Sequence, residues 1–286
     1  MNKKNKTSKI PLLLPFIFLL LVIILPAFYS LFLSFHDYTF GMERVYVSLE
    51  NWVDIIFSAD LWQILFRNII FVIAVVIGEI VGGTLIGLLM STGFPLQKFF
   101  ISIIMSPYAV SPVIAVMVWD RLLRTDVGFI NYLLTNLNLP QFSWAGDPTL
   151  SMILLIVIQV WIMLPFSFLI IYSAIIGIPQ TLLEAAEIDG AGLWQRIRYI
   201  ILPLIKPAIM VAALFRLIFS LRAFAVPWIL TEGGPAGATE LLSIRLYKTA
   251  FRFWRFGQAS AWAWIITLIT LLIASYYLVI FYRRTF

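Results

Sequence analysis

The chain contains no cysteine and only one histidine, His36, among its 286 residues. The lack of cysteine excludes disulfides, thiol chemistry and cysteine-ligated metals. A single histidine cannot build a metal site by itself, and we interpret His36 as a loop residue rather than a ligand or proton relay. The sequence offers no cluster of His, Asp and Glu for an intramembrane enzyme, so we expect neither catalysis by this chain nor a cofactor.

Charge is also scarce, since 12% of the residues are charged and 62% are hydrophobic. A soluble protein of this length carries about a quarter charged residues. A membrane-spanning helix needs roughly 20 apolar residues, and the chain has several runs of that length. We therefore predict an all-α integral membrane protein. Its net charge of +6 is interpreted as a signal of orientation in the lipid bilayer rather than of nucleic-acid binding.

A nucleotide-binding motif is missing too, because no Gly-x-x-x-x-Gly-Lys-Ser/Thr run occurs. Any ATP-driven role therefore requires a separate subunit. No internal repeat is evident, and no loop is long enough for a soluble domain. We predict a single transmembrane domain over residues 1–286.

Six apolar segments are predicted to span the membrane, at about residues 10–35, 68–90, 99–119, 150–177, 204–230 and 259–282. The first is too long for the apolar part of a secretion signal and lacks a small-x-small cleavage site, so we interpret it as an uncleaved span. Pro107 and Pro112 interrupt the third span. Pro165 is expected to kink the fourth span and open a polar cavity there.

Charges in the connecting segments predict the orientation of the spans. The termini, the 91–98 link and the segment up to Lys206 hold ten Lys or Arg and three acids. The three other loops hold seven Lys or Arg and ten acids. Because Lys and Arg are retained in the cytoplasm, both termini and the polar segment after the fourth span are predicted to be cytoplasmic.

That polar segment, residues 178–203, is predicted to form a helix–turn–helix elbow outside the membrane. Thr181 and Glu184 have the spacing of a capping box, which would start a first helix at Leu182 and carry it to about Asp189. Gly190 can leave the helical conformation at little cost and is expected to break the helix. A second amphipathic helix is expected from about residue 191 to Pro203, with apolar residues on one face: Leu193, Trp194, Ile197, Ile200 and Ile201.

The run Glu184-Ala185-Ala186, then Gly190, then Ile200-x-Leu202-Pro203 resembles the EAA loop in the permease subunit of binding-protein-dependent ABC importers. In that family the loop forms a coupling helix that docks in a cleft of the cytoplasmic ATPase. The resemblance implies that the ATPase contacts this helix through Glu184, Ala185, Ala186, Asp189 and Gly190. Glu184 could instead serve only to cap its own helix, and Asp189 could serve only as a helix-end turn former.

A second stretch, Thr231-Glu232-Gly233-Gly234-Pro235, predicts a tight turn at the outer end of the fifth span. With Thr239, Tyr247, Phe251 and the run 257–261, it resembles the first of two permeases in a carbohydrate importer. The resemblance implies an external docking role for Gly233, Gly234 and Pro235. The family often has Asp where this chain has Ala225, which weakens any substrate role at that position.

The same loop carries an amphipathic pattern that predicts a helix at the outer interface. Its basic face holds Arg245, Lys248, Arg252 and Arg255, and its other face holds Ile244, Tyr247, Phe251 and Trp254. Such a helix could anchor the protein in the membrane or form part of the docking surface for an external binding protein.

Charges inside spans are costly, so each is a candidate functional residue. There are three of them, Glu79, Arg216 and Arg222. Glu79 is expected either to pair with an arginine of the fifth span or to line the substrate pathway. Arg222 could hydrogen-bond sugar hydroxyls or pair with an acidic group of the substrate. Gln159 and Trp161 are weaker candidates, because sugars are held by planar hydrogen-bonding groups and aromatic faces.

We therefore expect a permease subunit of a sugar importer in the cell (inner) membrane of a bacterium or archaeon. The resemblance implies four partners: a second homologous permease, a cytoplasmic ATPase dimer, an extracellular or periplasmic substrate-binding protein, and a sugar. A secondary transporter centred on Glu79 is the first alternative, although such proteins usually show inverted repeats. An intramembrane enzyme is the second.

Overall fold

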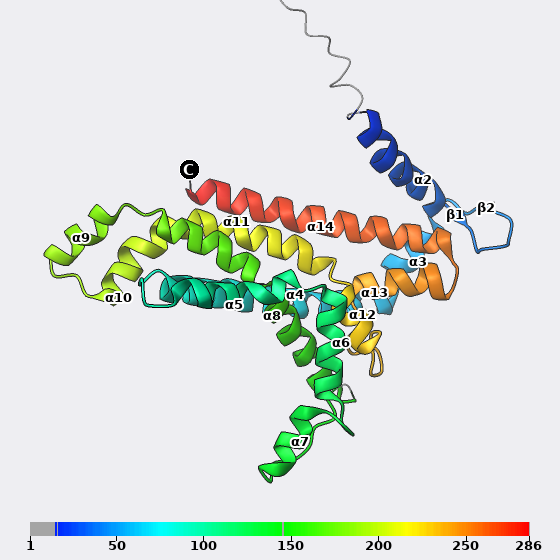
Figure 1. Ribbon diagram of the computed structural model, residues 1–286. Coiled ribbons are helices and arrows are strands. Elements are labelled where there is room, and N and C mark those ends of the chain that lie inside the picture. The colour runs from blue at the N-terminus through cyan, green and yellow to red at the C-terminus, as the bar shows by residue number, and fades with distance from the viewer. Residues whose placement is uncertain (1–14, 16, 145, 286) are drawn as a thin grey trace, which may run out of the picture. The chain divides into compact units, whose positions relative to one another are not determined.

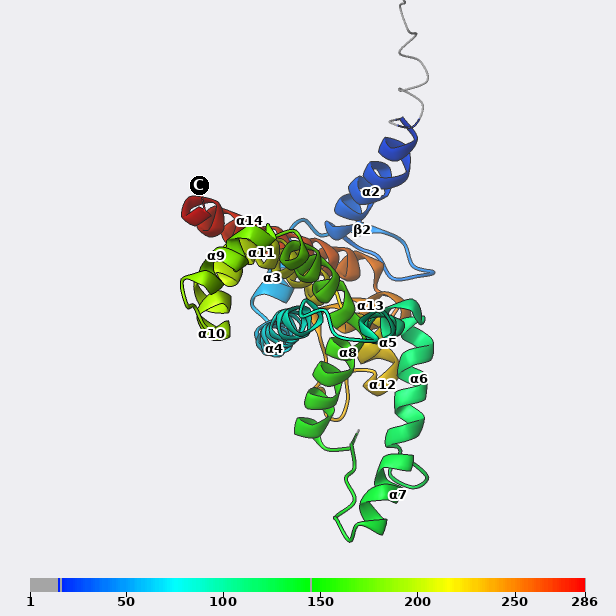
Figure 2. The ribbon, with the colours of Figure 1, turned by 60° about the vertical axis from the view of Figure 1, so that its left-hand side comes forward.

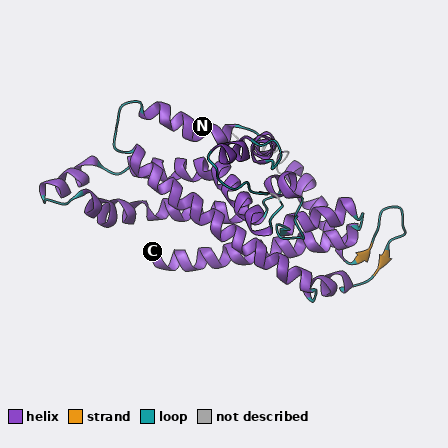
Figure 3. Ribbon diagram, turned by 90° about the horizontal axis from the view of Figure 1, so that it is seen from below, coloured by secondary structure: helices purple, strands orange, loops and turns teal. Residues whose placement is uncertain are grey.

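The computed structural model describes residues 15, 17–144 and 146–285, and these are mostly helical (Figures 1 and 3). The four lysines before the first apolar run, and the start of that run, lie outside the described residues. Within the described part, the only strands are two of two residues each. The predicted all-α class is confirmed.

One compact unit consists of residues 1–61 and 246–268. Its elements, apart from the beginning of α14 (Phe256–Thr285), are η1 (Leu20–Ile24), α2 (Leu25–Ser34), β1 (His36–Asp37), β2 (Val45–Tyr46), α3 (Glu50–Ile56) and η3 (Lys248–Arg252).

His36, expected in a loop, lies in β1, with Nδ1 2.8 Å from the carbonyl oxygen of Phe32. A Cβ on Gly257 would lie 1.9 Å from the carbonyl oxygen of His36. Only glycine therefore lets the last span start against this hairpin.

The other compact unit consists of residues 62–245 and 269–286. It holds α4 (Ala59–Met90), α5 (Gln97–Ala109), α6 (Pro112–Leu123), α7 (Phe129–Asn136), α8 (Pro148–Ile176), α9 (Gln180–Ile188), α10 (Leu193–Arg196), η2 (Ile197–Ile201), α11 (Leu202–Leu221), α12 (Ala225–Thr231) and α13 (Leu242–Tyr247). The start of α8 is capped by Asp147, whose carboxylate accepts hydrogen bonds from the backbone N–H groups of Thr149 and Leu150 at 2.9 and 2.8 Å.

Five continuous helical segments of the described chain are long and apolar enough to cross a membrane: Ile17–Ser34, Ala59–Met90, Pro148–Ile176, Leu193–Leu221 and Phe256–Ile280. A sixth crossing is possible through α5 and α6, which are bent by 96° at a short break (Figure 2). Ser111 is extended, with ψ of 130°, because the following Pro112 disfavours the helical conformation before it. The third predicted span is thus two helices rather than one.

The fifth predicted span also differs from expectation. It was expected to run as one helix over 204–230, but α11 ends at Leu221 and α12 starts at Ala225. Arg222 is the exposed C-cap residue of α11 and not a charge in the middle of a span. Within unbroken α8, Pro165 is buried.

Two expectations about the elbow were wrong. The first helix, α9, begins at Gln180 with Pro179 as its N-cap and no side-chain capping hydrogen bond, so Thr181 and Glu184 do not form a capping box. The second helix is not separate from the membrane segment, because α10, η2 and α11 follow without interruption. Pro203 lies in the first turn of α11, where its missing N–H costs little.

Two apolar clusters hold this unit together. One is centred on α8 and includes Leu155, Ile158 and Ile162, all at most 1% exposed. The other joins the far end of α8 to the elbow, because Ile171 and Ile175 pack with Ile201 and Ile205. Leu183 of α9 packs against the second cluster, so the elbow is fixed to the helices that precede and follow it.

Candidate functional site

The elbow has exposed apolar side chains at its tip. Ile188, at the end of α9, is 86% exposed, and Trp194 of α10 is 67% exposed. Gly190 between them has a φ of +80°, in the left-handed region that glycine adopts without strain, which confirms the predicted break. Figure 1 shows α9 and α10 projecting where α8 ends and α11 begins. A group of exposed large apolar side chains is typical of an interaction site.

An ion pair links the two arms of the elbow. Arg196 Nη1 lies 2.9 Å from Glu187 Oε2, and the Gln195 side chain accepts a hydrogen bond of 2.8 Å from the backbone N–H of Gly192. A cavity of about 400 Å³ lies beneath α9, and Glu184 is one of its lining residues. Glu184, Ala185, Asp189 and Gly190 are exposed and Ala186 is half-buried, so this helix leaves the predicted contact residues accessible.

Glu79 and Arg216 form an ion pair between α4 and α11. They are 0% and 2% exposed, Arg216 Nη2 donates to Glu79 Oε1 at 2.9 Å, and Arg216 Nε donates to Glu79 Oε2. A bidentate arginine–carboxylate pair has fixed geometry as well as charge neutrality. Of the two roles left open for Glu79, the structure supports pairing with the fifth span.

Arg216 also lines a cavity of about 330 Å³ in the second unit. Gln159 lines it from α8, together with Phe166, while Tyr108 enters from α5 just before the break. Its walls are otherwise aromatic and aliphatic: Pro112, Met163, Phe219, Ala223, Phe224, Ala225 and Val226. The cavity is therefore formed where α5 meets α6 and where α11 meets α12, at both helix breaks.

The other two candidates are placed differently. Trp161 is 40% exposed and packs edge-on against Trp119, with ring centroids 5.6 Å apart, and it does not line this cavity. Arg222 does not line it either. The aromatic residues Tyr108, Phe166 and Phe219 were not singled out from the sequence. The available signal was Pro107 and Pro112, which mark the break beside Tyr108.

The turn at residues 231–235 is held by two threonines. The hydroxyl oxygens of Thr231 and Thr239 are 2.7 Å apart, and Thr239 Oγ1 donates to the carbonyl oxygen of Gly234 at 2.5 Å. Thr239 is fully buried. The predicted turn is confirmed, and threonine hydroxyls of the same loop hydrogen-bond to the backbone of Gly233 and Gly234.

Residues 79–285 match the family described as binding-protein-dependent transport system inner membrane component. One relative is the trehalose/maltose transport system permease protein MalF of Thermococcus litoralis. The two sequences are 31% identical, and the alignment covers 94% of this chain and 90% of the relative. Another relative is the diacetylchitobiose uptake system permease protein DasB of Streptomyces coelicolor. Here the identity is 30%, and the alignment covers 82% of this chain and 72% of the relative.

Solved structures show the same fold. The chain matches a bacterial ABC transporter involved in the import of the acidic polysaccharide alginate, with a TM-score of 0.87, 21% identity and coverage of 96% of this chain and 95% of that chain. A second match, with a TM-score of 0.83, 22% identity and coverage of 93% and 91%, is an alginate transporter in complex with an alginate pentasaccharide-bound periplasmic protein.

Proposed function

Because this chain belongs to the family of binding-protein-dependent transport system inner membrane components, we propose that it forms half of an ATP-driven, alternating-access pathway for a sugar or oligosaccharide. As a member of this family it is a multi-pass inner-membrane permease subunit and not the ATPase. The sugar substrate is supported by relatives named for trehalose/maltose and diacetylchitobiose. The other half of the pathway would come from a second, homologous permease.

The observation that carries the substrate proposal is the cavity at the two helix breaks. A pyranose has apolar C–H faces and polar edges, so it fits a site with aromatic walls and few polar groups. Phe166 and Phe219 supply the walls, and the Gln159 amide can both donate and accept hydrogen bonds. Arg216 retains donors beyond the two bonded to Glu79.

The elbow is the proposed site of coupling to a cytoplasmic ATPase dimer. Its exposed Ile188 and Trp194 would be covered by the ATPase, and its attachment to the α8–α11 cluster would transmit ATPase closure to the spans. This arrangement requires the elbow and both termini to be cytoplasmic, as the charge distribution of the loops predicts. An extracellular or periplasmic binding protein would then dock on the opposite side, where residues 233–235 are predicted to lie.

Purification of the chain in detergent from its native cells tests the proposal. We expect a second permease and a P-loop ATPase to be recovered with it, and ATP hydrolysis by the complex to rise when the sugar-loaded binding protein is added. Recovery of this chain alone as a transport-competent homo-oligomer would overturn the proposal in favour of a secondary transporter.

Gly190→Val tests the elbow. A β-branched residue at a φ of +80° costs about 1–2 kcal/mol in backbone strain, whereas no atom within 4 Å would clash with a Cβ. We expect sugar-stimulated ATP hydrolysis to fall several-fold, while insertion of the spans is unchanged. Gly190→Asn is the matched control, because asparagine tolerates the left-handed conformation, and it should keep most of the coupling. Unchanged coupling in Gly190→Val would remove the elbow from the transmission route.

A further inference from the structure

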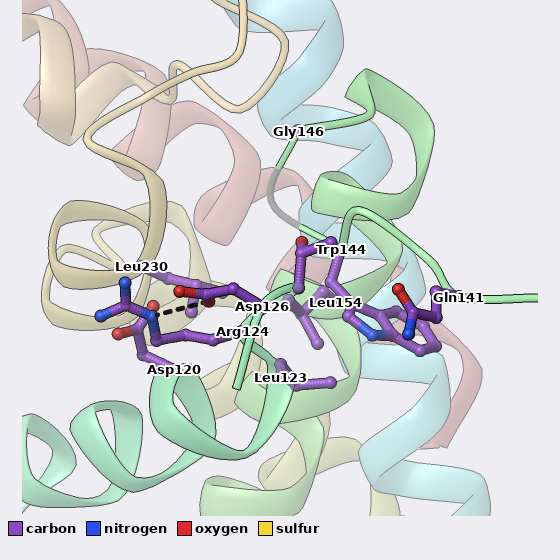
Figure 4. Close-up of a pocket in the computed structure, with 10 residues that line it drawn as sticks. Asp120, Leu123, Arg124, Asp126, Gln141, Trp144, Gly146, Leu154 and Leu230 are labelled. Carbon is purple, nitrogen blue, oxygen red and sulfur yellow. Dashed lines mark hydrogen bonds and ion pairs between the residues drawn. The ribbon is translucent and has the colours of Figure 1, made fainter. Parts of the chain in front are cut away.

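The loop between α6 and α8 borders a third cavity, an open one of about 490 Å³, that the proposed pathway does not use. It lies at the end of α6, and all its lining residues belong to the second unit. In Figure 4, Asp120, Arg124 and Asp126 lie on one side of it, while Trp144 and Gln141 lie on the other. The volume is within the range of small-molecule sites.

A single buried side chain organises this loop. Asn131 of α7 is 1% exposed. Its Nδ2 donates to the carbonyl oxygens of Phe142 at 2.9 Å and Thr125 at 3.4 Å, and its Oδ1 accepts from Trp144 Nε1 at 3.1 Å. Asn131 thus ties both segments that border the cavity to α7. It also fixes the indole of Trp144, so the site is formed before any ligand arrives.

The turn that follows α6 is equally constrained. The backbone N–H of Gly128 donates to the carbonyl oxygen of Arg124 at 2.9 Å, and a Cβ at Gly128 would lie 2.2 Å from that same oxygen. At the other border, Asp147 caps α8. Both segments that carry lining residues are therefore held by local hydrogen bonds.

The polar groups of the cavity are suited to hydroxyl groups. Arg124 Nε lies 3.4 Å from Asp126 Oδ1 in an exposed pair, and such pairs contribute little to stability, so both side chains can exchange partners for a ligand. The backbone N–H of Asp126 and then the nearby Arg124 hold the pKa of the Asp126 carboxyl below its usual value, so it stays an ionised acceptor. Trp144 adds an aromatic surface beside these groups.

Charge favours a neutral ligand over an acidic one. Two carboxylates, Asp120 and Asp126, face a single guanidinium, Arg124, among the lining residues. A uronate would therefore meet net repulsion. The cavity of about 330 Å³ at the two helix breaks agrees with this preference. Arg216 is the one arginine among its lining residues, and its charge is already neutralised by Glu79.

We propose that the cavity of the α6–α8 loop is a subsite for a neutral saccharide unit, which holds one end of the incoming sugar outside the membrane before it enters the pathway. The proposal rests on the proposed function, because it takes the importer's substrate to be a sugar and this loop to be extracellular. It adds two claims, a second sugar-binding position and a preference for neutral sugars. Either claim can be wrong while the assignment as an importer subunit stands.

Photo-crosslinking with defined sugars tests the subsite. The complete complex in nanodiscs is illuminated with diazirine derivatives of maltose, trehalose and diacetylchitobiose, and with a matched derivative of an alginate trisaccharide. Labelled peptides are mapped by mass spectrometry. We expect at least one neutral probe to label peptides within residues 120–146, at a half-saturating concentration about ten-fold below that of the uronate probe.

Three variants sharpen the test. Asp120→Asn keeps the shape of the side chain but removes a charge-assisted acceptor, and Gln141→Ala removes a planar amide, so each should reduce labelling of residues 120–146 several-fold. Tyr132→Ala is the matched control. Tyr132 is 64% exposed on α7 and does not line the cavity, so labelling should not change.

The outcomes separate the two proposals. Labelling confined to peptides of α8 and α11 would overturn the subsite and leave the importer assignment in place. Equal or stronger labelling of residues 120–146 by the uronate probe would overturn the neutral preference. If neither a neutral nor an acidic sugar labels the complex or stimulates ATP hydrolysis, the subsite and the proposed function both fail.

Discussion

Replacing Arg216 with alanine is expected to destabilise the helix bundle by about 3–5 kcal/mol, because it leaves the fully buried Glu79 carboxylate without its partner. The penalty comes from the stranded charge more than from the lost hydrogen bonds. We expect a large fall in the thermal unfolding temperature of the purified complex and in the amount of folded chain recovered from membranes. Unfolding of Arg216→Ala at the wild-type temperature would contradict a structural role for the pair.

The double variant Glu79→Met with Arg216→Met separates stability from transport. Replacing both members of a buried ion pair with apolar residues of similar size is often neutral for stability, so the unfolding temperature should return close to that of the wild type. Transport should remain impaired, because Arg216 also lines the cavity at the two helix breaks. Full recovery of transport would show that Arg216 acts only as the partner of Glu79.

The sequence was sufficient to identify Glu79 and Arg216 as unusual but not to pair them. A charge in an apolar run stands out, and both residues were identified for that reason. They are 137 positions apart, however, and Arg222 was an equal alternative for Glu79. The choice depends on which face of α11 packs on α4 and on where α11 ends. Because the helix ends at Leu221, Arg222 becomes an exposed cap.

Helix ends were predictable only where the local chemistry is decisive. The first helix of the elbow ends just before Gly190 as expected, since glycine adopts the left-handed conformation without strain. Thr181 and Glu184 had the spacing of a capping box, but α9 starts at Gln180, too early for Thr181 to be its N-cap. Pro203 was expected at the end of the elbow, before the apolar fifth span, but it lies in the first turn of α11, which continues α10 and η2 without interruption.

The α6–α8 loop was missed because its organisation is not visible in the sequence. Asn131 is one of several polar residues in a stretch that was predicted only as a loop, and asparagine is common in loops. Its importance comes from hydrogen bonds to Thr125, Phe142 and Trp144, up to 13 positions away. Periodicity and motif spacing do not report such contacts.

Two adjacent glycines of α4 approach α8 in different ways. A Cβ on Gly83 would lie 2.9 Å from the backbone nitrogen of Phe168 and 3.1 Å from the carbonyl carbon of Ser167. A Cβ on Gly82 would lie 2.7 Å from Cδ1 of Leu164, the flexible end of a side chain. Small residues let membrane helices pack closely where there is no other driving force.

Gly83→Ala is therefore expected to force α4 and α8 apart and to destabilise the bundle by about 1–3 kcal/mol, the usual cost of overpacking. Gly82→Ala adds the same methyl group one residue earlier, but Leu164 can change rotamer to accommodate it, and alanine favours the helix by up to about 1 kcal/mol over glycine. Its unfolding temperature in detergent should stay near that of the wild type. An equal fall in the unfolding temperature of both variants would contradict this explanation. The added methyl group would then act in the same way at both positions, whether it meets backbone or a flexible side chain.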